Sequence, residues 1–596
     1  MDRNTLTGMM LIAAILLGWG YFMKPNEAEV KQYQHQTDSI KNAKAGIKPT
    51  PVAANKSVAT TADSSVVKTQ QFITLENEKI KVTLSTKGGR VYSTEIKGQK
   101  TFDGKPVVLF NGDDNRFGFK LPLTSKNVNT NDEFFQPVGS SFTVAGKDSN
   151  SVTMRLTFSP TQYVDYVYSL KGESYLLNYG VTLVGMNQLI SPSAKALNLE
   201  WKSDLKQQEK DKKNEQSFTT VYYRQENGDI DYLSESKDKE EKPEEPLKWV
   251  SFKQHFFSSV LIAQDKFQGS TLNTVTDLTK PALKNLSADL VVPYTAKPID
   301  QLNFKFYFGP NQFNQLKNVG YDLEKQVNLG WGPLGWINRW AVIPLFNFLA
   351  NNFNLNFGII ILILTVVLKL VLLPITYTSY MSQAKMRALK PEMDAIKEKV
   401  GEEDQTKLQQ EYMKLYKQAG VNPLAGCIPL LLQMPILLAF FRFFPASFEL
   451  RQQPFLWMND LSTYDSVINF GVNIPFLGSH LSLMCVLMTI STLIYTWMNN
   501  RISGVTGQMK YIGYIMPIVF LGALNSFPAG LNFYYFCANI ITFAQQFIIG
   551  KFINQDAIHA KIQENKKRPN ANKKSKWQMR LEEMTKQQQA AQQRKK

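Results

Sequence analysis

Residues 364–376 read LTVVLKLVLLPIT, an apolar run that contains one lysine, Lys369, and closes around a proline. Such a run is typical of a membrane-spanning helix, which needs about 20 apolar residues to cross a hydrocarbon core of about 30 Å. A charged ammonium group inside that core costs about 2.5–3.5 kcal/mol on insertion scales. The stretch therefore predicts a span in which an acidic partner or water offsets the cost of the lysine.

Apolar stretches of similar length recur in the C-terminal part of the chain. Five spans are predicted, at about 357–378, 423–444, 477–498, 511–527 and 531–550. Only the tripeptide PAG separates the last two, which predicts an antiparallel pair.

The N-terminal residues 1–23 are also mostly apolar. We interpret them as an uncleaved transmembrane anchor, because they offer no small-x-small cleavage pattern and exceed the usual apolar core of a signal peptide. A cleaved signal peptide is the alternative interpretation. Residues 24–70 contain few large apolar side chains, so they are predicted to form a flexible linker.

The distribution of basic residues predicts the orientation of these spans. Residues 379–420 contain eight Lys and Arg and the tail 551–596 contains thirteen, whereas the loop 447–475 has only Arg451. Cytoplasmic loops carry the excess of basic residues in membrane proteins. With six spans in total, both termini are therefore predicted to be cytoplasmic, and the large domain after the linker is predicted to lie outside.

That large domain, residues 72–325, shows period-two alternation of apolar and polar residues, with aromatic and β-branched enrichment. This pattern predicts an antiparallel β-sandwich. The charged stretch 235–246 inside it is interpreted as a solvated loop. Residues 331–353 then place Trp331, Trp336 and Trp340 along a short apolar segment, which predicts a helix lying in the membrane interface. A helix buried against the sandwich is the alternative.

Between the first two of the five spans, residues 379–420 form two amphipathic segments joined by GEED. Apolar residues at steps of three and four predict a cytoplasmic helical hairpin. In one interpretation the apolar stripes of the two helices only pack on each other. In the other they also provide a docking surface. The residues of the stripes are Met386, Leu389, Met393, Ile396, Leu408, Tyr412 and Leu415.

The chain has a formal charge of +17, from 67 Lys and Arg against 50 Asp and Glu, and the tail 551–596 concentrates much of it. Anionic phospholipids and ribosomal RNA are equally consistent with such a tail. The three cysteines all fall in apolar stretches, and the four histidines show no metal-ligand spacing. No metal site, catalytic constellation, nucleotide-binding motif or cofactor is predicted.

Lys369 lies nine residues before the predicted cytoplasmic end of its span, about 13 Å deep at 1.5 Å per residue. This is too deep for its stem to reach the headgroups easily. The five spans contain no Asp or Glu, so a hydrated cavity is favoured over an ion pair. A tolerated snorkelling lysine is the alternative. Neutral polar residues available for the walls of such a cavity are Thr365, Gln433, Asn532, Gln545 and Gln546.

Four motifs carry a resemblance to a known family: NPLAGCIPLLLQMPILLAFF (422–441), AKMRALKPEM (384–393), ELRQQPFLWMNDLS (449–462) and FPAGLNFYYFCANIITFAQQ (527–546). Together, and in their order along the chain, they resemble the YidC/Oxa/Alb family of membrane insertases, in its Gram-negative form with a large periplasmic domain. The resemblance is dense across 331–550, whereas residues 24–330 match by pattern only.

The resemblance implies a non-enzymatic insertase of the inner membrane. Such a protein accepts nascent membrane proteins in a hydrophilic groove open to the cytoplasm and to lipid, alone or with the Sec translocon, and meets the ribosome. It also implies that Thr365, Met434 and Tyr535 line the path of the entering segment. Lys369 stands where the family usually has arginine, which keeps the charge but loses the bidentate fork.

Two other classes of protein compete with this interpretation. A solute transporter or channel with Lys369 as its substrate site predicts more polar residues in the spans and usually an internal repeat. A membrane-anchored periplasmic enzyme needs a catalytic constellation, but residues 72–310 hold no cysteine and only one histidine, His255.

Overall fold

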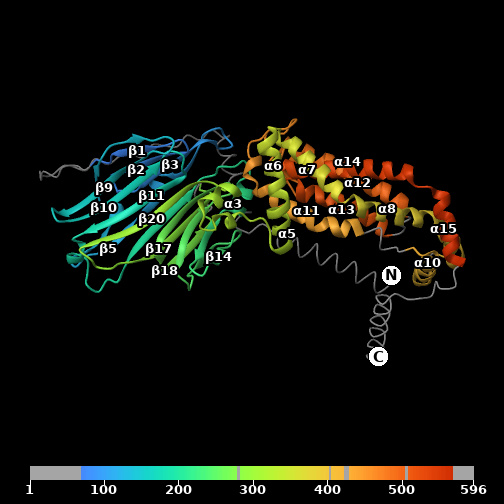
Figure 1. Cartoon of the computed structure of the whole chain (residues 1–596), viewed down its shortest axis with the longest axis horizontal. Coiled ribbons are helices and arrows are strands. Elements are labelled where there is room, and N and C mark those ends of the chain that lie inside the picture. Colours follow the sequence, from blue (N-terminus) through green and yellow to red (C-terminus); the bar gives the residue numbers. More distant parts are fainter. Residues whose placement is uncertain are drawn as a thin grey trace, which may run out of the picture.

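The structure is a computed structural model that describes residues 69–277, 279, 282–401, 405–421, 428–503 and 508–567. Figure 1 shows two bodies placed end to end, one built of strands and the other of helices. The predicted anchor, the linker up to residue 68, Cys427 and the tail beyond residue 567 lie outside the described residues.

The largest sheet of the β body has nine strands, and all of its pairings are antiparallel. In spatial order its strands are β14 (Ile230–Tyr232), β13 (Thr220–Gln225), β16 (Leu247–Lys253), β17 (Phe257–Phe267), β20 (Ile299–Pro310), β11 (Leu176–Val184), β10 (Gln162–Lys171), β9 (Ser149–Ser159) and β7 (Gln136–Val138).

Two smaller sheets complete this body. The six-stranded sheet has the order β15 (Lys239–Glu241), β18 (Gly269–Val275), β19 (Lys284–Pro293), β12 (Ala196–Leu205), β5 (Asn115–Pro122) and β6 (Asn127–Asn129). The five-stranded sheet has the order β4 (Pro106–Asn111), β3 (Val91–Lys100), β2 (Ile80–Ser85), β1 (Phe72–Glu76) and β8 (Phe142–Thr143).

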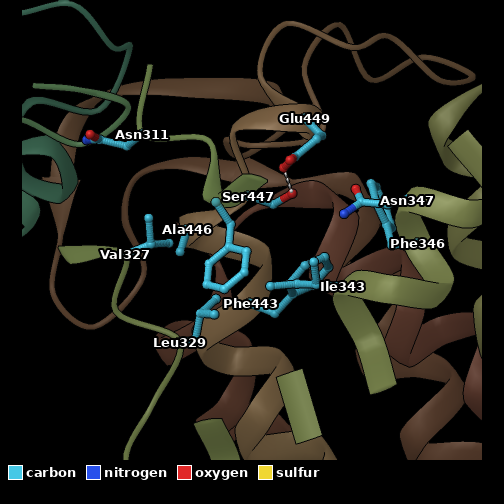
Figure 2. Close-up of a pocket in the computed structure, with 11 residues that line it drawn as sticks. Asn311, Val327, Leu329, Ile343, Phe346, Asn347, Phe443, Ala446, Ser447 and Glu449 are labelled. Atoms are coloured by element: carbon cyan, nitrogen blue, oxygen red, sulfur yellow. Dashed lines mark hydrogen bonds between the residues drawn. The ribbon is translucent and has the colours of Figure 1, made fainter. Parts of the chain in front are cut away.

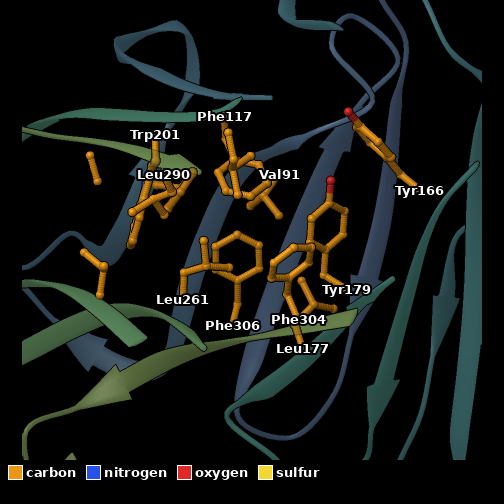
Figure 3. Packing of buried hydrophobic residues seen from close by; sticks show 14 of the residues in the cluster. Val91, Phe117, Tyr166, Leu177, Tyr179, Trp201, Leu261, Leu290, Phe304 and Phe306 are labelled. Atoms are coloured by element: carbon orange, nitrogen blue, oxygen red, sulfur yellow. The ribbon is translucent and has the colours of Figure 1, made fainter. Parts of the chain in front are cut away.

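Aromatic side chains join the nine-stranded and six-stranded sheets (Figure 3). The ring of Phe306 on β20 meets Phe117 of β5 edge to face, with centroids 5.0 Å apart, and lies 6.2 Å from Trp201 of β12. Burial alternates along β11 and β19, as a period-two pattern requires. The predicted β-sandwich-like domain is therefore confirmed.

Two details of the β prediction were wrong. The sheets are not wholly antiparallel, because β1 pairs with β8 in parallel, with Leu75 opposite Phe142. The charged stretch 235–246 is not only a loop, since it contains β15, which pairs with β18. A short exposed edge strand tolerates charged residues, so its composition resembled that of a loop.

The helical body begins after two short helices of the β body, α3 (Lys212–Phe218) and α4 (Phe313–Val319). Its elements are α5 (Gly332–Ile337), a π-helical turn (Asn338–Val342), α6 (Ile343–Phe353), α7 (Phe357–Val371), α8 (Leu373–Ala388), α9 (Lys390–Val400), α10 (Gln405–Ala419), α11 (Ile428–Ala446), the strands β21 (Ser466–Ile474) and β22 (Gly478–Ser482), α12 (Leu483–Ser503), α13 (Gln508–Leu524), α14 (Ala529–Phe552) and α15 (Gln555–Lys567).

The predicted span 357–378 is not one straight helix. The chain bends by 61° between α7 and α8, at Leu372. Pro374 is the cause, because a proline ring has no N–H to donate and collides with the carbonyl group four residues earlier, here that of Leu370. Lys369 therefore lies next to the bend rather than deep inside an unbroken span.

The other predicted spans also differ from the helices observed. Residues 478–482, placed in the third span, form β22, so that helix begins at Leu483. Within the described ranges, no single helix has both the length and the apolar character of a full membrane crossing. Two bent pairs, α7 with α8 and α14 with α15, have this length and apolar character when the two helices of each pair are taken together. The number of spans stays a prediction.

A loop after α11 joins the two bodies. His255 of the β body forms a 2.7 Å hydrogen bond from Nε2 to the carbonyl oxygen of Pro445, and Gln452 donates to the carbonyl oxygen of Lys100 at 2.8 Å. Phe448 packs edge to face on Phe257, with ring centroids 5.7 Å apart. Polar and aromatic contacts together thus fix the β body against one end of the helices.

Candidate functional site around Lys369

Lys369 is buried at the meeting point of three helices, with only 7% of its surface exposed. Its ammonium group donates to Thr542 Oγ1 on α14 at 2.9 Å and to Gln433 Oε1 on α11 at 3.2 Å. Gln545 Nε2 donates to the backbone oxygen of Lys369 at 3.1 Å. Among the described residues, no carboxylate lies within ion-pair distance of this lysine. Two neutral oxygens thus contact the cation, and the hydrated cavity around it stays a prediction.

The polar residues predicted from the sequence divide into two groups by position. Gln433 and Gln545 contact Lys369 directly, and Thr365 lies one helical turn before it, fully buried, with its hydroxyl donating to the carbonyl oxygen of Ile361 at 2.6 Å. Asn532 does not join them. It lies ten residues before Thr542 on α14, about 15 Å along the helix, and donates to the carbonyl oxygen of Leu524.

The two residues named only from the resemblance differ in how exposed their side chains are. Met434 is 47% exposed on α11, next to Gln433, whereas Tyr535 is half-buried among apolar side chains of α11, α12 and α14. The structure does not bring Tyr535 to the ammonium group of Lys369. The roles of both residues in guiding a client stay predictions.

Several buried amide oxygens near this site have no protein partner. They belong to Gln545 and Gln546 on α14, and a further one belongs to Gln383 on α8, fourteen residues after Lys369 and beyond the bend. Buried polar groups are almost always hydrogen-bonded to protein or to water. The arrangement is therefore suited to polar molecules or polar chain segments at this point of the helical body.

The sequence prediction missed Thr542, the nearer acceptor of Lys369. It also missed Asn539, which donates to Ser491 Oγ at 2.9 Å and to Thr492 Oγ1 at 3.0 Å on α12. A signal was available, because Asn539, Thr542 and Gln545 follow at steps of three and so occupy one face of a helix.

The predicted interfacial segment is helical, with a π-helical turn in its middle. Trp331, Trp336 and Trp340 are all exposed, by 76%, 72% and 76%. The segment is held from the other face by Asn338, which is fully buried and donates to the carbonyl oxygen of Ala439 on α11 at 2.7 Å. The alternative, a helix buried against the sandwich, does not fit this exposure.

The apolar stripes of the predicted hairpin meet in one cluster. It contains the predicted Met386, Leu389, Met393, Ile396 and Leu415. Leu408 and Tyr412 are half-buried and lie outside this cluster. Tyr416 belongs to it instead of Tyr412, and its hydroxyl lies 3.3 Å from Met393 Sδ. The stripes thus pack on each other, which both predicted possibilities include, and an additional docking surface stays a prediction.

A third helix completes this cluster, and it lies in the stretch predicted to be only a basic tail. Ile558 and Ile562 of α15 are buried against α10 and α8. Lys566 of α15 also pairs with Glu392 of α9, and Asn565 donates to the carbonyl oxygen of Ala419 at 3.2 Å. The first part of the tail is therefore a packed helix (Figure 1).

A small cavity lies at the junction between the two bodies (Figure 2). The cavity there, between Leu329, Ile343 and Phe443, has a volume of about 10 Å³, and Ser447 Oγ donates to Glu449 Oε2 beside it at 2.9 Å. One water molecule needs about 10–15 Å³ of such space. This cavity is therefore too small for a ligand. A second cavity at the junction has a volume of about 430 Å³ and is lined by residues of both bodies, among them Lys100, Glu209, Gln452 and Trp457.

Two family models together cover most of the chain: "YidC periplasmic domain" matches residues 72–344, and "60Kd inner membrane protein" matches residues 348–557. A membrane protein insertase YidC of Parabacteroides distasonis is 38% identical over 99% of this chain and 98% of its own length. The chain belongs to the YidC membrane protein insertase family. The family predicted from the sequence is therefore confirmed.

A second curated relative agrees with this assignment. The YidC of Amoebophilus asiaticus is 36% identical, over 98% of each chain. A crystal structure described as an active YidC insertase with its first transmembrane domain resolved is 19% identical, covers 80% of this chain and 92% of its own, and has a TM-score of 0.33. The relatives from Parabacteroides distasonis and Amoebophilus asiaticus are named as insertases, so they support neither the transporter nor the enzyme interpretation.

Proposed function

We propose that this chain inserts nascent membrane proteins at the place where α7, α11 and α14 meet around Lys369. The observation that carries the proposal is a buried cation held by the neutral oxygens of Gln433 and Thr542. A lysine with a fixed carboxylate partner would be neutralised permanently. One with neutral partners keeps its charge available for water and for polar or acidic groups of a client.

Exposed apolar side chains next to this site supply a way into lipid. Val366 and Leu370 lie one turn apart on α7, and Met434 and Leu438 lie one turn apart on α11, with 37% to 57% of their surfaces exposed. A client's polar flank is held near Lys369 while its apolar segment moves along these faces. Partitioning supplies about 0.3–0.6 kcal/mol for each large apolar residue, so the step requires no nucleotide.

The orientation and the partners form part of the same proposal. Both termini are cytoplasmic, the β domain is periplasmic, and the site around Lys369 opens to the cytoplasm and to lipid as a hydrophilic groove of the inner membrane. The exposed tryptophans of residues 331–353 hold α5 and α6 in the interface. The basic tail contacts the ribosome or anionic phospholipids, and the Sec translocon passes some of the clients to this groove.

A reconstituted insertion assay tests the role of Lys369. Proteoliposomes containing Lys369→Ala should insert a client with an acidic flank less efficiently than the parent, whereas Lys369→Arg should preserve insertion because it keeps the charge. Lys561→Ala is the matched control, since it removes an exposed lysine of α15. Unchanged insertion of acidic-flank clients by Lys369→Ala would refute the role of the charge.

A further inference from the structure

The strands β21 and β22 form a hairpin between α11 and α12 with an unusual surface. Residues 466–482 (SVINFGVNIPFLGSHLS) contain no Asp, Glu, Lys or Arg. Four large apolar side chains of this hairpin are nevertheless exposed: Val467 and Ile468 by 49% each, Val472 by 65% and Phe476 by 67%. An exposed, uncharged apolar patch usually marks an interaction surface.

The hairpin is held rigidly at the helix ends by one buried asparagine. Asn525, in the turn between α13 and α14, donates from Nδ2 to the carbonyl oxygens of Leu477 at 2.8 Å and His480 at 2.6 Å. Its Oδ1 accepts from the backbone N–H of Ser482 at 2.9 Å. Asn525 is fully buried, so the position of the hairpin relative to the helices is set by the fold.

The tip of the hairpin touches the exposed face of α13. The ring of Phe476 lies so close to Gly522 that a Cβ atom there would come within 2.3 Å of it. One and two turns earlier on the same face of α13, Ile518 and Ile515 are each exposed by 55%. The apolar surface of this helix, which belongs to a predicted span, therefore continues onto the hairpin.

The root of the hairpin faces the β domain. The ring of His480 on β22 stacks on Tyr464 with centroids 3.7 Å apart, and Lys210 of the β domain places its ammonium group 4.5 Å from the centre of the Tyr464 ring. The hairpin thus lies at the end of the helical body that carries the β domain. The hairpin therefore lies beside the ends of the helices and not beside their middle.

We propose that this hairpin lies in the lipid surface of the leaflet on the β-domain side, with Ile468, Val472 and Phe476 directed into the upper acyl region. The absence of charge and the continuity with α13 favour lipid over an acidic or basic protein partner. The hairpin has only two strands, so its outer edges need water for their N–H and C=O groups. An interfacial position supplies both water and hydrocarbon.

A fluorescent probe placed on the hairpin measures its depth. The full chain, with its three cysteines replaced by alanine, receives Val472→Cys or Ile468→Cys, is labelled with an environment-sensitive dye and is reconstituted into phosphatidylcholine vesicles with one-fifth phosphatidylglycerol. Asn227→Cys, in the exposed turn between β13 and β14, is the control. We expect a blue-shifted emission at both hairpin sites, quenching by a doxyl group near the headgroup, and at least threefold less quenching by iodide than at the control.

Two results would overturn the proposal. Equal iodide quenching at both hairpin sites and at the control would place the hairpin in water. Shielding that rises with the protein-to-lipid ratio, without quenching by doxyl lipids, would instead assign this surface to a second copy of the chain. Using two hairpin sites protects the test against a single labelled variant that fails to fold.

Discussion

Arg451 and Glu209 form an ion pair across the junction between the two bodies, with Nε of the arginine 2.7 Å from Oε1 of the glutamate. Both side chains are largely buried, with 2% and 11% of their surfaces exposed. The guanidinium group also lies 4.9 Å from the ring centre of Phe257 and donates to the carbonyl oxygen of Lys100. One loop residue therefore ties the helical body to two sheets of the β domain.

Removing this arginine should destabilise the junction strongly. Arg451→Ala leaves Glu209 buried without its partner, and breaking a buried pair in this way costs about 3–5 kcal/mol. We expect a clear fall in the melting temperature of the full chain in detergent. The exposed pair Arg116–Asp132 provides the control, because Arg116→Ala should change stability by less than about 1 kcal/mol. Equal effects of the two variants would contradict the structural role of Arg451.

The stability of the folded chain should depend on pH through the carboxyl group of Glu215. This group accepts hydrogen bonds from the backbone N–H groups of Gln208 and Glu209. Burial, and next the charge of Glu209, raise the pKa of Glu215 from its ordinary 4.5 to about 8. Between these values the folded chain holds a proton that the unfolded chain has lost, so stability falls as pH rises. From pH 6.5 to pH 8 the loss is about 2 kcal/mol.

Melting curves between pH 6.5 and pH 8 test this expectation. The upper limit avoids Lys253 and Lys284, because burial lowers the pKa of each from 10.5 to about 8, so that both oppose Glu215 above pH 8. Burial also raises the pKa of Glu209 from 4.5 to about 7, so this group adds to the decline only below about pH 7. The lower limit avoids His255, whose pKa burial lowers from 6.5 to about 3, so that it opposes Glu215 only below pH 6.5. Glu215→Gln stays neutral throughout and should flatten the decline of melting temperature with pH. An unchanged decline in this variant would show that Glu215 is not the titrating group.

Thr542 should matter through Lys369 rather than through packing alone. Thr542→Val keeps the shape of the side chain but removes the acceptor of a buried ammonium group, which costs about 1–3 kcal/mol. Thr542→Ser keeps the hydroxyl and should keep most of the stability. In a Lys369→Met background, Thr542→Val should lose most of its effect on the melting temperature. Additive effects of the two changes would argue against coupling.

The sequence predicted the elements whose patterns are set by local burial. Strands such as β10 and β11 show the predicted period-two alternation, because each has one face in a core. The helices α11 and α14 follow the apolar runs for the same reason. Neighbouring residues alone determine these patterns, so one sequence is sufficient.

What escaped prediction depends on contacts between distant segments. The sequence predicts a loop and part of a span where β21 and β22 lie, because their apolar residues suit either structure. Asn525, which fixes the hairpin, is 43 to 48 positions away in the chain. Around Lys369 the sequence predicted neutral polar partners, including Gln433 and Gln545. It could not choose Thr542, because the rotation of α14 against α7 decides which residues face the lysine.

The packing of α15 leads to a last prediction, about the hairpin of α9 and α10. Ile562 is only 2% exposed within the cluster that α15 forms with Leu389 and Leu415. Ile562→Ala removes buried methyl groups and should weaken this docking by about 2–5 kcal/mol. We expect faster amide hydrogen exchange across 390–400 and 407–419, with no change in the β domain. Lys561→Ala, one residue away but exposed, should leave exchange unaltered. Unchanged exchange in Ile562→Ala would mean that the hairpin holds its place without α15.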